Sequence, residues 1–233
     1  MTKILGIIPA RAGSKRVPEK NFRPFADTTL MDLAISQGLQ ATCLDDLLVT
    51  SDSPEVLEIA RKYDGVIPLN RPTELARDTS PAIDYQKHAL AYMKKEFHKA
   101  YDWVVIIQPS SPLRSGKDID ATVELFRQYP DADSAVSVVK VQHMIHPFKL
   151  KTMHGVRLLP FFTEEKGKTA AHELPDVYVR NCAVYVFKSS NIIEKDTLLG
   201  KNSVGYVMPL ETSVDINEAL EFEFAEFLYK RRK

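Results

Sequence analysis

Short apolar runs alternate with longer amphipathic segments along most of this chain, and this alternation constrains the fold more than any other feature. The short runs predict strands at residues 3–8, 47–50, 65–68, 103–108, 135–141, 183–187 and 204–208. The longer segments predict helices at residues 29–40, from 53 onward, from 80 to about 97, at 117–129 and after 217. Such alternation predicts an α/β fold, with a Rossmann-like, mostly parallel sheet and helices on both faces.

Three of the expected helices have a local start signal. Ser53-Pro54 places a capping hydroxyl directly before a proline at the first helical position, and Ser80-Pro81 repeats the pattern. Asn217 is expected to cap the last helix, whose far end carries the basic run 230–233. Positive charge at that end suits the dipole of the helix.

Residues 142–175 interrupt the alternation, with three prolines and charged residues in no clear period. We expect residues 1–233 to form a single domain, with 142–175 inserted as a lid or dimerisation arm of short strands and loops. His143 and His146 in this stretch are three apart, a spacing that suits zinc on a helix. Pro147 follows at once and no cysteine or acidic partner is near, so a structural or surface role is expected.

Composition excludes several classes of partner. Lys and Arg number 31, as do Asp and Glu, so the net charge is zero, which argues against nucleic acid as the main partner. Cys43 and Cys182 are far apart and form no CxxC pattern, as expected for reduced thiols in a cytoplasmic protein. No apolar run is long enough for a signal segment or a membrane span, so no membrane partner is expected.

The most informative segment is the basic loop at residues 9–21, which follows the first predicted strand. Arg11, Lys15, Arg16 and Lys20 lie around the turn at Gly13-Ser14. Ligands of open α/β sheets bind beyond the carboxyl ends of the strands, which also selects the loops after residues 50, 108 and 214. Clustered cations and exposed backbone N–H groups suit a polyphosphate, although the spacing matches neither a Walker A loop nor GxGxxG. The alternative is a solvated basic loop.

The segment 9–21, PARAGSKRVPEKN, resembles the N-terminal motif of the cytidylyltransferases that activate acidic sugars, of which CMP-sialic acid synthetases are the best known. Further matches follow in order at TSD 50–52, RPTELARDTS 71–80, QPSSPLR 108–114, RNCAVYVF 180–187 and SVDIN 213–217. The resemblance covers nearly the whole chain. The first and fourth motifs are specific when they occur together.

The resemblance implies a nucleotidyltransferase that transfers CMP from CTP to the anomeric hydroxyl of a sialic-type nonulosonic acid, with Mg²⁺ as cofactor. It also implies a homodimer that forms through the insertion. The residues implied to act in catalysis are Arg11, Lys15, Lys20 and Asp215. Substrate contacts are implied for Ser14, Asn21, Arg71, Ser80, Gln108, Ser110 and Tyr185. For Ser80 the alternative is a plain helix cap, and for Tyr185 a core position.

Two positions depart from the family pattern. Many members have Asp-Ile-Asp where this chain has Asp215-Ile216-Asn217, so Asp215 is expected to ligate the metal, and Asn217 either ligates it or only caps the helix. Many members that activate sialate have an arginine about where Ala171 stands. Because this arginine is absent, legionaminic, pseudaminic or 3-deoxy-octulosonic acid is also possible as the sugar substrate. Lys168 or His172 is the candidate to supply the missing cation.

Two functional alternatives remain open on the residues alone. One is a nucleotidyltransferase of the same fold that uses another NTP or a sugar phosphate. The other is a nucleotide-binding protein without turnover, for which Asn217 is the one hint. No GxSxG elbow is present to favour a serine hydrolase. Residues 111–118 are better explained by helix capping at Ser115 than by a second phosphate loop.

Overall fold

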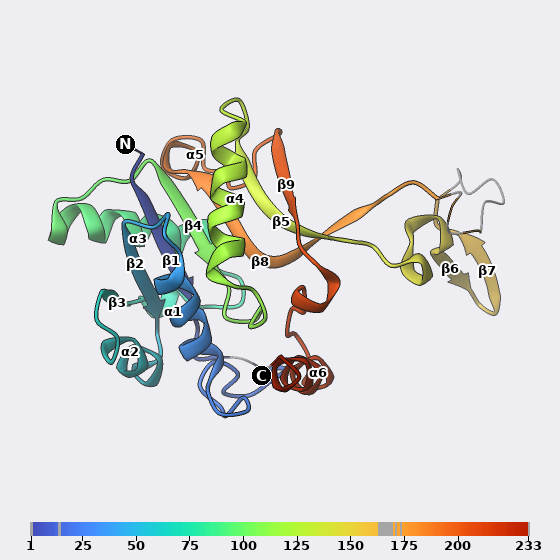
Figure 1. Ribbon diagram of the computed structural model, residues 1–233, viewed down its shortest axis with the longest axis horizontal. Helices are drawn as coiled ribbons and strands as arrows, with labels where there is room; N and C mark the ends of the chain where they lie inside the picture. Colours follow the sequence, from blue (N-terminus) through green and yellow to red (C-terminus); the bar gives the residue numbers. More distant parts are fainter. Residues whose placement is uncertain (1, 14, 163–169, 171, 173, 233) are drawn as a thin grey trace.

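The computed structural model describes residues 2–13, 15–162, 170, 172 and 174–232 (Figure 1). Its main sheet has seven strands in the order β3-β2-β1-β4-β8-β5-β9. These strands are β1 (Ile4–Pro9), β2 (Asp46–Ser51), β3 (Val66–Asn70), β4 (Trp103–Ile107), β5 (Ser134–Lys140), β8 (Tyr178–Lys188) and β9 (Ser203–Val207). All seven predicted strands are therefore confirmed, with β8 extending five residues before its predicted start at 183.

The sheet is mostly parallel, as predicted. β1 pairs in parallel with β2 and β4, β2 with β3, and β5 with β9. β8 is the exception, since it runs antiparallel to both β4 and β5. The carboxyl ends of β1, β2 and β4 consequently lie at one edge, where the basic loop emerges.

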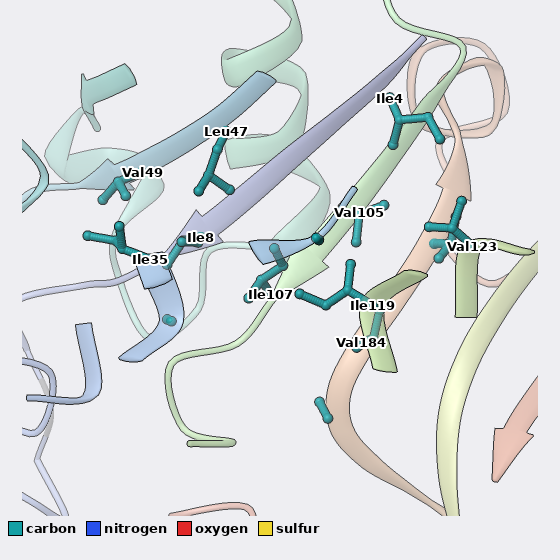
Figure 2. Close-up of a cluster of buried hydrophobic side chains, with 14 of the residues drawn as sticks. Ile4, Ile8, Ile35, Leu47, Val49, Val105, Ile107, Ile119, Val123 and Val184 are labelled. Carbon is teal, nitrogen blue, oxygen red and sulfur yellow. The ribbon is translucent and has the colours of Figure 1, made fainter. Parts of the chain in front are cut away.

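Helices cover both faces of the sheet. They are α1 (Leu30–Gln40), α2 (Pro54–Arg61), α3 (Ala82–Phe97), α4 (Gly116–Gln128), the unpredicted short α5 (Ser189–Ile193) and α6 (Ala219–Lys230). Figure 2 shows one core cluster, in which Ile35 of α1 and Ile119 and Val123 of α4 pack against the strands. A second cluster packs α3 and α5 on the opposite face. Adjacent strand residues such as Ile4 and Leu5 enter different clusters, because side chains alternate across a strand.

α6 packs on the loop after β1 rather than on the sheet. Its Phe222 meets Phe25 edge to face, with ring centroids 5.3 Å apart, and Val17 and Ile216 are buried in the same cluster. The apolar contacts therefore tie the C-terminal helix and the segment before it to the basic loop (Figure 1).

The predicted cap at Ser53 is confirmed, since its side chain accepts the Val56 N–H. The other two cap predictions are wrong. α3 begins at Ala82 after an extended Pro81, which leaves Ser80 too far back, and Ser80 Oγ donates instead to the Glu74 carbonyl at 2.7 Å. α6 is capped by Glu218, whose capping box with Glu221 takes over the position expected for Asn217.

Residues 142–175 leave the main sheet at the end of β5 and return to it at β8. Their described part contains the hairpin of β6 (Lys151–His154) and β7 (Arg157–Pro160), which forms a separate two-stranded sheet. Figure 1 shows this segment extending away from the sheet as an arm. Within it His146 contacts the Pro175 carbonyl at 3.0 Å and accepts the Phe148 N–H, which is a structural role. No helix in the described part of the chain has both the length and the apolar character needed to cross a bilayer.

Candidate active site

A cavity of about 540 Å³ lies at the carboxyl ends of β1 and β4. This volume falls within the range of small-molecule sites. It brings together eight of the residues singled out from sequence: Arg11, Lys15, Lys20, Asn21, Arg71, Gln108, Ser110 and Asn217. Ser14 lies outside the described residues, and Ser80 is not among those that line the cavity. We call this space the basic cavity.

Five cations line the basic cavity: Arg11, Lys15, Arg16, Lys20 and Arg71. Lys20 is partly buried, and its Nζ donates to the Ile216 carbonyl at 2.8 Å. Burial lowers the pKa of Lys20, and the nearby carboxylate of Asp215 opposes that shift. Removing the ammonium from water makes an arriving polyanion a stronger partner for it, since less solvent screens the attraction.

Arg71 lines the basic cavity, and only 5% of its surface is exposed. Its guanidinium donates to the Thr50 carbonyl at 2.8 Å and lies 4.5 Å from the ring centroid of Tyr85. Burial lowers the pKa of Arg71, and burial raises the pKa of Tyr85 to about 12. A flat, rigid surface of this kind suits a planar ligand group such as a base.

Asn21 supports the basic loop rather than pointing freely into the cavity. Its side chain is buried and donates to the Arg11 backbone carbonyl at 3.3 Å. The backbone carbonyl of Asn21 accepts the Met31 N–H of α1. The asparagine therefore fixes the loop onto the first helix.

A second group, which meets the basic cavity through Ser110 and Asn217, centres on Asp215, a residue that is not itself among those lining the cavity. Ser110 Oγ donates to its carboxylate at 2.6 Å, and Asn217 Nδ2 donates to the other oxygen at 3.0 Å. Asn217 Oδ1 faces away and accepts from Arg16 at 3.3 Å. The Asp215 carboxylate is therefore the charged oxygen donor of this group. Asn217 turns its amide nitrogen, not its amide oxygen, toward that carboxylate.

The described residues contain no cluster of three or more His, Cys, Asp or Glu side chains that could hold a metal by themselves. The oxygen donors of the Asp215 group are a carboxylate and an amide, which are types of ligand that Mg²⁺ takes in proteins.

A second cavity of about 450 Å³ adjoins the first, and the two share Ala82, Tyr85 and Gln108. Tyr185 lines it, and burial raises the pKa of the Tyr185 phenol. The remaining wall is largely apolar, built from Ile106, Phe187, Leu198 and Leu199. We call this space the acceptor cavity.

Arg180 is the cation among the described residues that line the acceptor cavity, and sequence reasoning quoted it in a motif but gave it no role. Lys168, one expected substitute, lies outside the described residues, and His172, the other, is exposed and absent from both cavity walls. Arg180 reaches the same wall as Tyr185 because β8 is irregular. Cys182 has a left-handed backbone (φ 60°), and the pairing register with β5 shifts there.

Asp78 is a second residue that sequence reasoning missed. Its carboxylate pairs with Arg11 through one oxygen and with Lys15 through the other, at 2.5 Å for Lys15. These contacts hold the pKa of Asp78 below its usual value, the Lys15 hydrogen bond contributing most. The signal that could have revealed it is its place in the 71–80 motif, two residues before Ser80.

Comparison with known proteins agrees with this geometry. A family model described as "Cytidylyltransferase" matches residues 5–230. The "Post-translational flagellin modification protein B" of Campylobacter coli is 29% identical over 232 residues, covering 100% of this chain and 97% of that protein. An "N-acylneuraminate cytidylyltransferase" of Escherichia coli is 30% identical over 234 residues, covering 99% of this chain and 53% of the longer relative.

Among solved structures, a CMP:2-keto-3-deoxy-manno-octonic acid synthetase complexed with CTP superposes with a TM-score of 0.71. The match covers 100% of both chains at 15% identity, which supports the fold. The family match spans nearly the whole chain and includes the strands, the basic loop and the segment around Asp215. The chain therefore belongs to the cytidylyltransferase family.

Proposed function

We propose that this cytidylyltransferase transfers CMP from CTP to the anomeric hydroxyl of an acidic sugar, a sialic-type nonulosonic acid, and releases pyrophosphate. The observation that carries the proposal is the pair of adjoining cavities: among the described residues, five cations line one, and Arg180 in a largely apolar wall lines the other. A polyphosphate suits the first, and an acid with one carboxylate suits the second.

In the basic cavity, Arg11, Lys15 and Lys20 would bind the triphosphate. As the sugar hydroxyl attacks the α-phosphorus, the bond to the β-phosphate breaks and negative charge collects on the departing pyrophosphate. The three cations are placed to meet that charge, so catalysis rests on positioning and electrostatic stabilisation. Arg71 and the segment that Ser80 braces would hold the cytidine, with Asn21 supporting the basic loop and Ser14 as a further proposed contact of the nucleotide.

Mg²⁺ is the proposed cofactor, with Asp215 as its protein ligand and the nucleotide phosphates completing the site. When bound, the ion neutralises phosphate charge and orients the nucleotide. Ser110 holds the Asp215 carboxylate in place through its 2.6 Å hydrogen bond. Asn217 would need to turn its amide to join the metal, since its oxygen now faces Arg16.

In the acceptor cavity, Arg180 would bind the sugar carboxylate, and Gln108 and Tyr185 would contact the ring hydroxyls. Phe187, Leu198 and Leu199 offer an apolar surface. Sugar hydroxyls buried against this surface would lack hydrogen-bond partners, which is unfavourable. N-acyl groups would bury their methyls there. This wall favours a nonulosonic acid over a 3-deoxy-octulosonic acid.

A homodimer and a cytoplasmic location, where CTP is made, complete the proposal. The arm exposes large apolar side chains at Ile145, Met153, Val156, Leu158, Leu159 and Phe161. An apolar surface of this kind marks an interface, and a second copy of the chain is the proposed partner. Sedimentation should give a dimer, and Leu158→Asp should give monomers if the arm forms the contact.

Pyrophosphate release tests the function directly. The purified protein is incubated with Mg²⁺ and each of the four NTPs against a panel of nonulosonic and octulosonic acids. Release with CTP and a nonulosonic acid alone is the expected result. Release with another NTP or a sugar phosphate would keep the fold and overturn the cytidine assignment. CTP binding without release for any acid would favour a protein without turnover.

A further inference from the structure

The basic cavity contains an anion of its own. Among the described residues that line it, Asp78 is the one carboxylate beside five cations. Asp78 lies between the short 3-10 helix at Thr73–Leu75 and the start of α3, and it pairs with Arg11 and Lys15 of the basic loop. It is therefore placed where a polyphosphate would meet Arg11 and Lys15.

The contacts of Asp78 copy those of a phosphate. One carboxylate oxygen pairs with Arg11 and the other pairs with Lys15, as two oxygens of a bound phosphate would. Arg11 meets it through a single nitrogen, Nη1, rather than through the two-pronged geometry that makes arginine pairs rigid. Its side chain is 45% exposed, Arg11 is 42% exposed and Lys15 is 81% exposed. Pairs this accessible to water exchange partners easily.

Asp215 shows the contrast, because two neutral donors, Ser110 and Asn217, hold its carboxylate through hydrogen bonds. Asp78 instead neutralises two of the cations that the proposed function requires for the triphosphate. A ligand with several negative charges can displace it, and the carboxylate can return when the ligand leaves.

We propose that Asp78 is an internal anion that competes with the β- and γ-phosphates of CTP, and with pyrophosphate, for Arg11 and Lys15, and so promotes pyrophosphate release. This inference rests on the proposed function only in that the basic cavity binds a polyphosphate. The opposite role, in which Asp78 orders the two cations for the ligand, predicts the opposite sign in every binding measurement below.

The test is pyrophosphate binding by isothermal titration calorimetry, with Mg²⁺, to the wild type, Asp78→Asn and Glu74→Gln. Glu74 is the matched control, because it is an exposed carboxylate in the same segment that does not line the cavity. We expect pyrophosphate to bind Asp78→Asn about three- to tenfold more tightly, the range that losing two exposed ion pairs gives. Glu74→Gln should stay within about twofold of wild type.

Two further readouts separate competition from a change in folding. The difference between wild type and Asp78→Asn should shrink as salt is raised, since screening weakens exposed charges. In turnover assays, the inhibition constant of pyrophosphate should fall by the same factor as its dissociation constant. A variant that had merely lost structure would bind more weakly, not more tightly, and its thermal midpoint would fall below that of Glu74→Gln.

Equal or weaker pyrophosphate binding by Asp78→Asn would overturn the inference and leave the proposed function standing if the wild type still turns over CTP. Wild-type protein that binds pyrophosphate but shows no preference for CTP would overturn the cytidine assignment. The comparison at Asp78 would then still stand, because pyrophosphate carries no base.

Discussion

Asn181→Ala should be among the most destabilising single changes in the chain, because this side chain joins three parts of the fold. Asn181 lies on β8 and is 3% exposed. Its Oδ1 accepts from Ser137 Oγ on β5 at 2.6 Å and from the Ala183 N–H at 3.3 Å. Its Nδ2 donates to Ser213 Oγ at 2.9 Å and to Met208 Sδ at 3.2 Å.

The expected cost follows from these contacts. Three conventional hydrogen bonds at about 1 kcal/mol each, plus a weaker one to sulfur, give a loss of about 2–4 kcal/mol in the free energy of unfolding. For a chain of this length that corresponds to a fall of about 5–15 °C in Tm. Ser213→Ala is the comparison variant, since it removes one of the four contacts together with the 2.7 Å bond from Ser213 Oγ to the Pro209 carbonyl, and it should cost about 1–2 kcal/mol.

Urea denaturation followed by circular dichroism measures both variants. Activity should also fall well below the unfolding transition, because Asn181 holds the segment that leads from β9 to Asp215. If Asn181→Ala lost no more stability than Ser213→Ala, the hydrogen bonds would not act as the shared anchor that we infer.

Three other predictions test different parts of the molecule. Lys20→Ala should lower kcat about 100-fold or more with little change in Tm, and near-normal turnover would remove Lys20 from catalysis. Chelation with EDTA should abolish pyrophosphate release and added Mg²⁺ should restore it, whereas activity that survives chelation would refute the metal. Phe25→Ala, at a fully buried ring packed on Phe222, should cost about 3–5 kcal/mol in urea denaturation, and a loss below 1 kcal/mol would contradict the packing of α6 on the basic loop.

Much of the fold was predictable from local pattern. Strands buried on both faces leave nearly continuous apolar runs, and the main-sheet strands were found from those runs within a few residues of their ends. The cap at Ser53 was also predictable, because capping depends on residues only three positions apart. The same signal failed at Ser80, where the extended Pro81 moves the helix start beyond its reach.

The acceptor cavity shows a limit of a different kind. Alternation along a strand puts Arg180 and Tyr185 on opposite faces, since five positions separate them. The irregularity at Cys182 changes that parity and lets both line one cavity. Nothing in a single sequence marks a left-handed backbone at a cysteine, because that conformation is normally associated with glycine.

The α/β alternation, the basic loop after the first strand and the family resemblance could all be recognised from the chain alone, because each depends on neighbouring residues or on motif order. Which charged side chains meet, by contrast, depends on the three-dimensional fold. Asp78 lies 67 positions from Arg11, and Asp215 lies 105 positions from Ser110, yet each pair is in contact. Such contacts depend on how the sheet brings the ends of separate strands to one edge, and no local pattern encodes that distance.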